Sequence, residues 1–381
     1  MNIYQIVALA LPNSSGFKGA RVLNTLYALQ LGATPLGIGL LLTTYALFPL
    51  IFAVYAGKVS DRYGVRIPLL AGMAGMALGI FLPFVWPVLP ALYVAAAVTG
   101  AGFIFVQVSM QTLTGALGAG EARTRNFNLY ALTIATADFV GPVFAGLLID
   151  HAGHVRTYLY LSLFNVLALI GLLYLYRRIP PTGSKSEGRG QQRMMDLLKS
   201  AELRRIFIAS AVVITGLDLF QLYMPLYGHS VGLSASAIGM VLGAFAAASF
   251  VVRAMIPMLV RRYGEEATLL YSLFLAAATC VLIPFFSSAV VLGAIAFVLG
   301  LGLGIGQPLT VILTYNQSPA GRAGEALGLR IAINNSIHVV VPAVFGAVGT
   351  LFGLAPVFWA NSVFLAGGGY ASRKSKKTGK T

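Results

Sequence analysis

The chain has 381 residues, of which 58% are hydrophobic and only 10% are charged. Because a soluble globular protein carries about 25% charged residues, this composition excludes that class and indicates an integral membrane protein. Basic loops that face anionic lipid explain the formal net charge of +15, so we predict no nucleic-acid partner.

Apolar stretches of about 20 residues, the length that a helix needs to cross a bilayer, recur along the whole chain. Polar residues separate them, and the pattern predicts an all-α membrane protein with twelve transmembrane helices. The predicted spans are 4–31, 36–56, 67–87, 90–113, 126–149, 157–177, 204–228, 236–260, 268–287, 289–313, 324–349 and 354–371. The first stretch lacks the basic start of a cleavable signal peptide, so we expect a retained span.

Lysine and arginine side chains gather in alternate loops and thereby indicate the orientation. The basic loops hold Lys58, Arg62, Arg66, Arg123, Arg125, several residues of 177–205, Arg261, Arg262, Arg322 and the tail after 372. Arg156 is the exception on the opposite side. By the positive-inside rule both termini lie in the cytoplasm, and we expect the protein in the inner membrane of a bacterium.

A long polar segment divides six spans from six. Its first part is rich in proline, glycine and serine, whereas MMDLLKSAELRR has the spacing of a short amphipathic helix at the membrane surface. A plain tether explains this segment equally well. We predict an N-terminal half at 1–178, a cytoplasmic linker at 179–203, a C-terminal half at 204–372 and a basic tail at 373–381.

The two halves repeat each other at a constant offset of 200 residues. The matches include Gly16 with Gly216, DRYG at 61–64 with RRYG at 261–264, Gln107 with Gln307, Pro142 with Pro342, and Gly146 with Gly346. Chance does not explain one offset that carries a loop, a glutamine and a proline together. We therefore predict two pseudo-symmetric six-helix halves.

The loop GKVSDRYGVR, residues 57–66, carries a family signature. Its matching positions are Gly57, Asp61, Arg62, Gly64 and Arg66, whereas Val65 departs from the pattern. With two six-helix halves and a central linker, the chain resembles the major facilitator superfamily of transporters. The resemblance implies that fold and secondary active transport by alternating access. We expect no cofactor and a monomer, and because the sequence shows neither a nucleophile triad nor a phosphate loop, we predict that the protein is not an enzyme.

Physically, the glycines of this loop allow a tight turn. Asp61, Arg62 and Arg66 could pair with charges or helix ends of the other half and so form a cytoplasmic gate. The alternative is a solvated hairpin whose cations only fix the orientation. The second copy has Pro257 for Gly57 and Arg261 for Asp61, so such a latch would be one-sided.

A second signature lies in the fifth span. The sequence GPVFAG, which contains Gly141, Pro142 and Gly146, resembles the Gly-Pro motif of antiporters in the same superfamily. Ala145 stands where the fuller pattern has glycine. The resemblance implies exchange of protons for a drug or metabolite.

Charged residues occur deep inside the spans. Lys18 and Arg21 lie near the middle of the first span, too deep to reach the surface easily, so they must face a cavity. We expect the helix to be interrupted at 12–16, so that free backbone groups line the site. The offset of 200 matches Lys18 with Asp218, Arg21 with Gln221, and Asp138 with His338.

These positions give the candidate site. We expect the substrate to be bound by Lys18, Arg21, Gln107, Gln221, Gln307 and His338, which should converge between the halves. Asp138 and Asp218 are the only acids deep in a span and are candidates for proton coupling. The alternative is that each is a static ion-pair partner of Lys18, Arg21 or Arg330. For Arg253 and Arg330, extension towards the cytoplasmic surface is an equally good explanation.

Three function classes follow. The acids and the Gly-Pro motif favour proton-coupled export of a small organic solute. The cation pair favours an uptake carrier or exchanger of organic anions without proton coupling, and an anionic or zwitterionic solute would use both sets of residues. A sensor or a lipid flippase is the third class. The sequence shows no metal-ligand cluster, nucleophile triad or phosphate loop.

Overall fold

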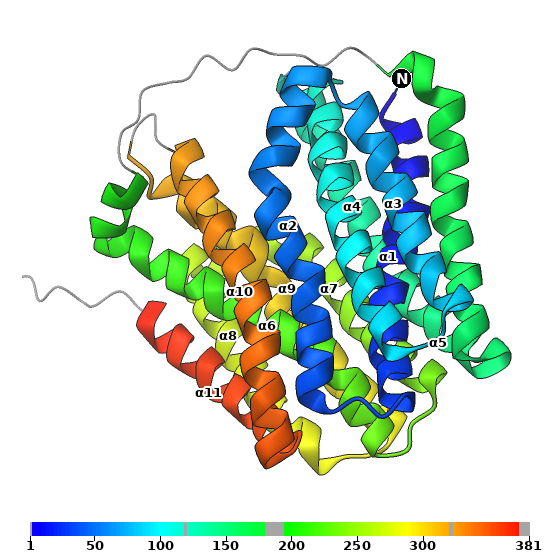
Figure 1. Ribbon diagram of the computed structural model, residues 1–381. Helices are drawn as coiled ribbons and strands as arrows, with labels where there is room; N and C mark the ends of the chain where they lie inside the picture. The colour runs from blue at the N-terminus through cyan, green and yellow to red at the C-terminus, as the bar shows by residue number, and fades with distance from the viewer. Residues whose placement is uncertain (1, 118–119, 180–193, 320–322, 373–381) are drawn as a thin grey trace, which may run out of the picture.

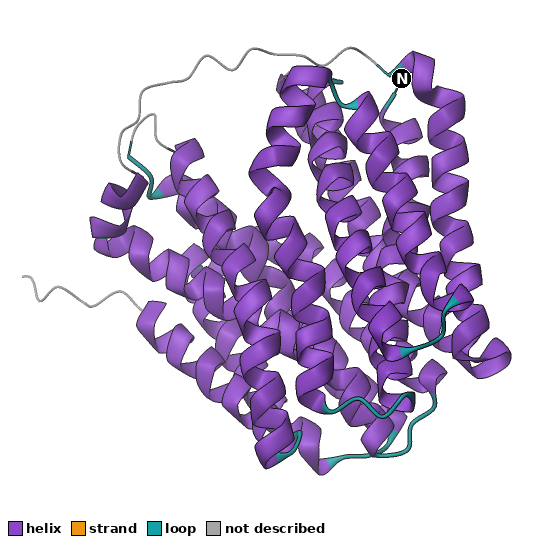
Figure 2. Ribbon diagram, viewed as in Figure 1, coloured by secondary structure: helices purple, strands orange, loops and turns teal. Residues whose placement is uncertain are grey.

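The computed structural model describes residues 2–117, 120–179, 194–319 and 323–372. Every regular element in these ranges is a helix, and they contain no strand (Figure 2). The side chains of a few helical residues, among them Gly57, Asp61 and Arg62, also lie outside the description. The predicted all-α class is confirmed.

The N-terminal half contains five α-helices and a short 3-10 helix. They are α1 (Ile3–Gln30), α2 (Pro35–Tyr63), α3 (Arg66–Val85), α4 (Leu89–Ala116), α5 (Gly120–Leu175) and η1 (Tyr176–Arg178). Two helices meet within α5 at Gly153, whose φ of 77° is readily adopted by glycine. Helix α5 therefore covers the fifth and sixth predicted spans.

The C-terminal half contains the remaining six α-helices. They are α6 (Ala201–Ser230), α7 (Ala235–Tyr263), α8 (Glu265–Leu282), α9 (Ala289–Asn316), α10 (Ala323–Phe352) and α11 (Ala355–Ser372), with η3 (Ile283–Phe285) after α8. With α5 counted as two helices, the helices correspond one to one with the predicted spans. By length and hydropathy, nine helices of the described residues qualify as membrane spans. Helix α1, which carries Lys18 and Arg21, is not among them.

The backbone repeats at the same offset as the sequence. The described glycines with positive φ form three pairs 200 residues apart, namely Gly32 with Gly232, Gly64 with Gly264, and Gly153 with Gly353. The helices that follow the first pair are capped alike, because Thr34 accepts from Gly37 N and Ser234 accepts from Ala237 N. The same turns thus recur in both halves, which are structural repeats.

The halves lie side by side and meet along two helix pairs, α2 with α10 and α5 with α7 (Figure 1). At Gly39 the backbone lies so close to the Pro342 carbonyl that no side chain would fit. At Gly239 a β-carbon would lie 2.6 Å from the Pro142 carbonyl oxygen. Gly39 and Gly239 are 200 residues apart, as are Pro142 and Pro342. The two contacts between the halves, α2 with α10 and α5 with α7, are therefore equivalent, and we call them the two seams.

The seams close one end of the bundle. We call this end, which contains the turn at 31–34, the far side, and the end that contains Ile3 and Ile179 the linker side. Leu36 N donates to Thr350 Oγ1 at the far side, and Thr43 donates to the Val339 carbonyl nearer the middle. Towards the linker side the two halves diverge (Figure 1). The structure is therefore a conformation closed at the far side.

The linker differs in part from the expectation. A six-residue 3-10 helix, η2 (Met194–Lys199), takes the place of the expected amphipathic α-helix, and α6 begins directly after it. Leu197 is buried against Leu203, Phe207 and Ala326 of the C-terminal half. Residues 180–193 and the tail 373–381 lie outside the described ranges, and the boundaries of the halves, linker and tail stay predictions.

Candidate functional site

Two contacts between an acid and a base, which we call the two pairs, lie near the middle of the helices, one in each half. Lys18 Nζ on α1 lies 2.6 Å from Asp138 Oδ1 on α5. His338 Nδ1 on α10 lies 2.6 Å from Asp218 Oδ2 on α6. The sequence predicted that these four residues occupy equivalent places, and the structure shows that they pair within each half.

The two pairs have opposite polarity. The N-terminal half carries the base on its first helix and the acid on α5, whereas the C-terminal half carries the acid on its first helix and the base on α10. Histidine is the side chain that normally changes charge near physiological pH, and lysine does not. The pairs are therefore geometrically equivalent but chemically different, because the base is a lysine in one and a histidine in the other.

The pairs also differ in burial. The side chains of Lys18 and Asp138 are 22% and 28% exposed, so neither partner is fully buried. Asp218 is only 5% exposed, whereas its partner His338 is 39% exposed. The imidazole therefore connects a buried carboxylate to accessible space. A buried carboxylate needs such a partner, because an unpaired charge is strongly destabilising.

Close helix packing brings the first pair together. At Gly141 on α5, a β-carbon would lie 2.8 Å from the Lys18 β-carbon, and at Gly19 on α1 it would lie 2.9 Å from the Gly141 carbonyl oxygen. Asp138 lies one helical turn before Gly141 and so faces Lys18. Because Gly141 has no side chain, α1 and α5 approach closely enough for the Lys18–Asp138 pair to form.

The rest of the Gly-Pro motif lies at a seam. The Pro142 carbonyl lies against Gly239 of α7, and Gly146 approaches the Ala235 carbonyl at the start of the same helix. Helix α5 therefore contacts Lys18 of α1 on one face and helix α7 of the C-terminal half on another.

The predicted interruption of α1 is wrong. The helix is continuous from Ile3 to Gln30 through Pro12. The polar residues of 13–16 are buried, and Gly16 packs against Leu161 and Asn165 of α5. Neighbouring helices can stabilise a proline inside a transmembrane helix, and here α5 covers the segment that we expected to line the site.

Arg21 and the three glutamines are not part of the pairs. Arg21 is half-buried, its Nε is buried without a hydrogen bond, and no acid of the described residues pairs with it. Gln107 and Gln221 are half-buried and Gln307 is exposed. In the part of the chain that the structure describes, their side chains form no hydrogen bond with either pair. Convergence of these residues on one substrate stays a prediction.

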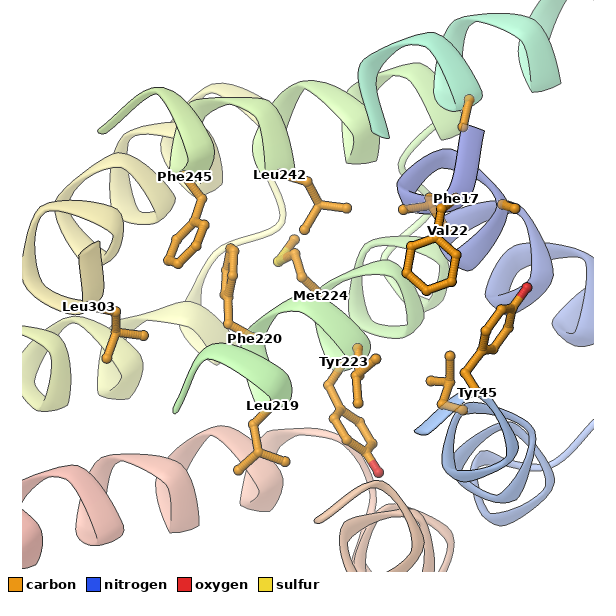
Figure 3. Close-up of a cluster of buried hydrophobic side chains, with 14 of the residues drawn as sticks. Phe17, Val22, Tyr45, Leu219, Phe220, Tyr223, Met224, Leu242, Phe245 and Leu303 are labelled. Carbon is orange, nitrogen blue, oxygen red and sulfur yellow. The ribbon is translucent and has the colours of Figure 1, made fainter. Parts of the chain in front are cut away.

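A cluster of buried side chains from both halves lies close to the charged residues of α1 and α6 along the chain. Val22 and Tyr45 come from the N-terminal half, and Tyr223 and Met224 come from α6 (Figure 3). All four side chains are buried, and in α1 and α6 they follow the charged residues in the direction of the far side. These four positions could not be predicted from the sequence, because such residues in a membrane helix carry no signal of their own.

The loop signature is only partly described. Gly64 ends α2 with a φ of 75°, as expected of a tight turn. Arg66 donates through Nε to the Ile179 carbonyl at 3.1 Å and lies 5.8 Å from the ring centre of Tyr176. These contacts of Arg66 are thus with the last residues of the N-terminal half and the first residue of the predicted linker, not with the C-terminal half. The side chains of Gly57, Asp61 and Arg62 lie outside the description, and the cytoplasmic gate stays a prediction.

The far side has a contact that the sequence analysis missed. Asp150 on α5 accepts from Ala235 N at 3.0 Å and from Ser236 N at 2.8 Å, at the start of α7. Thr350, 200 residues later, accepts from Leu36 N at 2.9 Å, at the start of α2. We call these contacts the Asp150 clasp and the Thr350 clasp. Their common offset is the sequence signal that could have revealed them.

Known proteins resemble the whole chain. The family description "Major Facilitator Superfamily" matches residues 7–342. The class G tetracycline resistance protein of Vibrio anguillarum is 26% identical over 350 residues, which cover 86% of this chain and 84% of the relative. The quinolone resistance protein NorA of Staphylococcus aureus is 23% identical over 349 residues, which cover 90% and 88%.

Solved structures share the fold. The nucleoside transporter NupG matches with a TM-score of 0.78 and 13% identity, over 98% of both chains. A POT family transporter in complex with 5-aminolevulinic acid matches with a TM-score of 0.77 and 12% identity, over 97% of this chain and 94% of that chain.

Proposed function

The chain belongs to the major facilitator superfamily, and from this premise we propose that it exports a small organic solute in exchange for protons. It is an integral membrane transporter and not an enzyme. The observation that carries the proposal is the presence of two acid–base contacts of opposite polarity at equivalent places of the two halves, near the middle of the helices. The names of the relatives, which state resistance to tetracycline and to quinolone, support export of a small organic solute.

The Asp218–His338 pair supplies the coupling step. Protonation of the Asp218 carboxylate removes its negative charge and thereby the attraction to His338. The contact between α6 and α10 at mid-depth then weakens, and the preferred arrangement of the two helices changes. Because His338 is the accessible partner, protons reach Asp218 through the imidazole. Lys18–Asp138 provides a second pair, in which neither partner is fully buried.

The basic loops support the orientation. The linker side, with both termini and 179–203, faces the cytoplasm of a bacterium, and the far side faces outwards. The structure then corresponds to the state that loads solute from the cytoplasm. Exposed apolar side chains such as Leu78 and Leu167 contact lipid. One chain contains both halves and both pairs, so a monomer suffices.

Reconstituted protein tests the proposal. A proton gradient across proteoliposomes should drive solute against its gradient, measured over a panel of organic anions and drugs. Asp218→Asn and Asp138→Asn should keep solute exchange and lose uphill transport, because shape and hydrogen bonding are largely kept. Glu202→Gln, an exposed acid at the linker-side end of α6, is the control and should transport normally. Full proton-driven transport by both Asn variants would refute the proposal.

One observation favours an organic-anion carrier as the second candidate. Arg21 has no acidic partner among the described residues, so its charge is available for an anionic group. In that case Asp218→Asn transports as well as the wild type, and dissipating the proton gradient has no effect on accumulation.

A further inference from the structure

Arg330 is a buried cation without an acid. It lies on α10, eight residues and about 12 Å to the linker side of His338, and is only 8% exposed. Neither explanation from the sequence holds, because the side chain does not extend to the surface and no acid of the described residues pairs with it. The side chain instead turns inwards among α6, α9 and α10.

Its partners are neutral and buried. Arg330 Nη1 donates to Ser210 Oγ at 3.2 Å and lies 3.5 Å from Thr310 Oγ1, and Ser210 donates to Asn334 Oδ1 at 3.0 Å. The exposed fractions of Ser210, Thr310 and Asn334 are 1%, 0% and 8%. We call these four residues the Arg330 cluster. It contains hydroxyl and amide groups but no carboxylate.

The guanidinium has unused donors. It carries five N–H groups in a planar fork that matches an oxyanion. In the described structure only Nη1 has partners, and Nε is buried without one. Because an uncompensated buried charge is strongly destabilising, the cluster is better suited to an arginine that binds an anion than to one that only packs.

The cluster is a local departure from the repeat. Ser210 and Arg330 are 120 residues apart, as are Asp218 and His338, so both contacts lie along the same face between α6 and α10. The equivalent residues of the N-terminal half are Ala10 and Tyr130, and neither is a cation. Among these equivalent positions, the C-terminal half alone therefore adds a buried cation on the same face as its Asp218–His338 pair.

We propose that the Arg330 cluster is an oxyanion subsite that binds a carboxylate or phosphate group of the exported solute on the linker side of Asp218–His338. This inference rests on the proposed function and deepens it, because it assigns the solute an anionic group and a place. A solute bound there can extend towards His338, about 12 Å away. Proton binding and solute release would then both take place between helices α6 and α10.

Anion binding to the purified protein tests the subsite. The protein is placed in nanodiscs of phosphatidylcholine, and its thermal unfolding is followed with inorganic phosphate or citrate at constant ionic strength. The wild type should be stabilised, and Arg330→Gln should weaken the apparent affinity at least about tenfold. Arg330→Lys, which keeps the charge but not the fork, should be intermediate. Arg253→Gln, a half-buried arginine on α7 outside the cluster, should bind as the wild type does.

Milder variants guard against a folding defect. If Arg330→Gln does not accumulate in the membrane, Ser210→Ala and Thr310→Val remove only the neutral partners and should each weaken binding about threefold. Equal anion affinity in the wild type and these variants would overturn the subsite.

Lipid is the other source of an oxyanion. Nanodiscs that contain phosphatidylglycerol replace the free anions in a second series. Stabilisation by this lipid alone, lost in Arg330→Gln, would overturn the assignment to solute and identify a lipid phosphate. Anion binding that depends on Arg330, with no proton-driven transport by the wild type, would overturn only the proposed function. Proton-driven transport with no such binding would overturn only this inference.

Discussion

The Asp150 clasp should hold the far side closed, and its removal should favour the open state. The carboxylate accepts at 3.0 and 2.8 Å from the first two backbone N–H groups of α7, where the helix end is partially positive. Asp150→Asn removes the charge and one of the two acceptors. Loss of a helix-capping side chain costs about 1 kcal/mol, and the exposure of Asp150 to solvent argues against a larger value.

A change of about 1 kcal/mol is about fivefold in the equilibrium between closed and open states. Thr43, which donates to the Val339 carbonyl in the α2–α10 seam, is a suitable reporter position. After replacement of the buried Cys280 by alanine, a cysteine at position 43 can react from the far side only when the halves separate. Its labelling rate by an impermeant thiol reagent in intact cells should therefore rise about fivefold in Asp150→Asn.

The Thr350 clasp supplies the matched control. Thr350→Val removes a neutral acceptor, so the labelling rate should rise only about two- to threefold, and Thr350→Ser should leave it unchanged. An unchanged rate in Asp150→Asn would refute the idea that charge at the start of α7 holds the closed state.

Three further predictions concern the site and the orientation. Lys18→Met should lower the yield of protein in the membrane, because Asp138 loses its cation, whereas Lys18→Met with Asp138→Asn should restore the yield but not proton-driven transport. Recovery of that transport would contradict a coupling role. Arg21→Gln should weaken binding of an acidic solute about ten- to hundredfold, measured from the concentration dependence of transport, and an unchanged affinity would be inconsistent with direct contact. Ser184→Cys should react with an impermeant reagent only in inverted vesicles, and reaction in intact cells would reverse the orientation.

The helices could be predicted from the sequence because hydropathy and span length follow from the bilayer. The prediction of 4–31 for the first span compares with Ile3–Gln30 in the structure. The bend at Gly153 also fits the two spans predicted within α5. The interruption of α1 was predicted wrongly, since the local polarity of 13–16 says nothing of the helix that packs on it.

The site was predictable only as a set of equivalent positions. The constant offset gave Lys18 and Asp218 the same place, but pairing depends on how α5 and α10 are rotated about their axes. For Lys18 and Asp138 that rotation is fixed by the approach of Gly19 to Gly141, a tertiary contact. The partner of Arg66, the Ile179 carbonyl, is a backbone group and leaves no mark in the sequence.

The repeat distinguishes the positions at which the two halves pack together from the polar positions deep in the helices. The positions that bring the seams together, Gly39 with Pro342 and Gly239 with Pro142, have the same residue types in both copies, because backbone approach tolerates no side chain. The contacts that must separate when the far side opens are therefore equivalent on both sides of the bundle.

The deep polar positions show the opposite behaviour. Lys18 becomes Asp218, Asp138 becomes His338, and Tyr130 becomes Arg330, so every change alters charge while the backbone stays equivalent. A fully symmetric set of charges would respond alike in both halves and give protons no preferred pair. Among the described residues, the C-terminal half alone combines a histidine, a buried carboxylate and a buried arginine without an acid, so the two halves present different chemistry at equivalent places, as the proposed coupling of protons to solute requires.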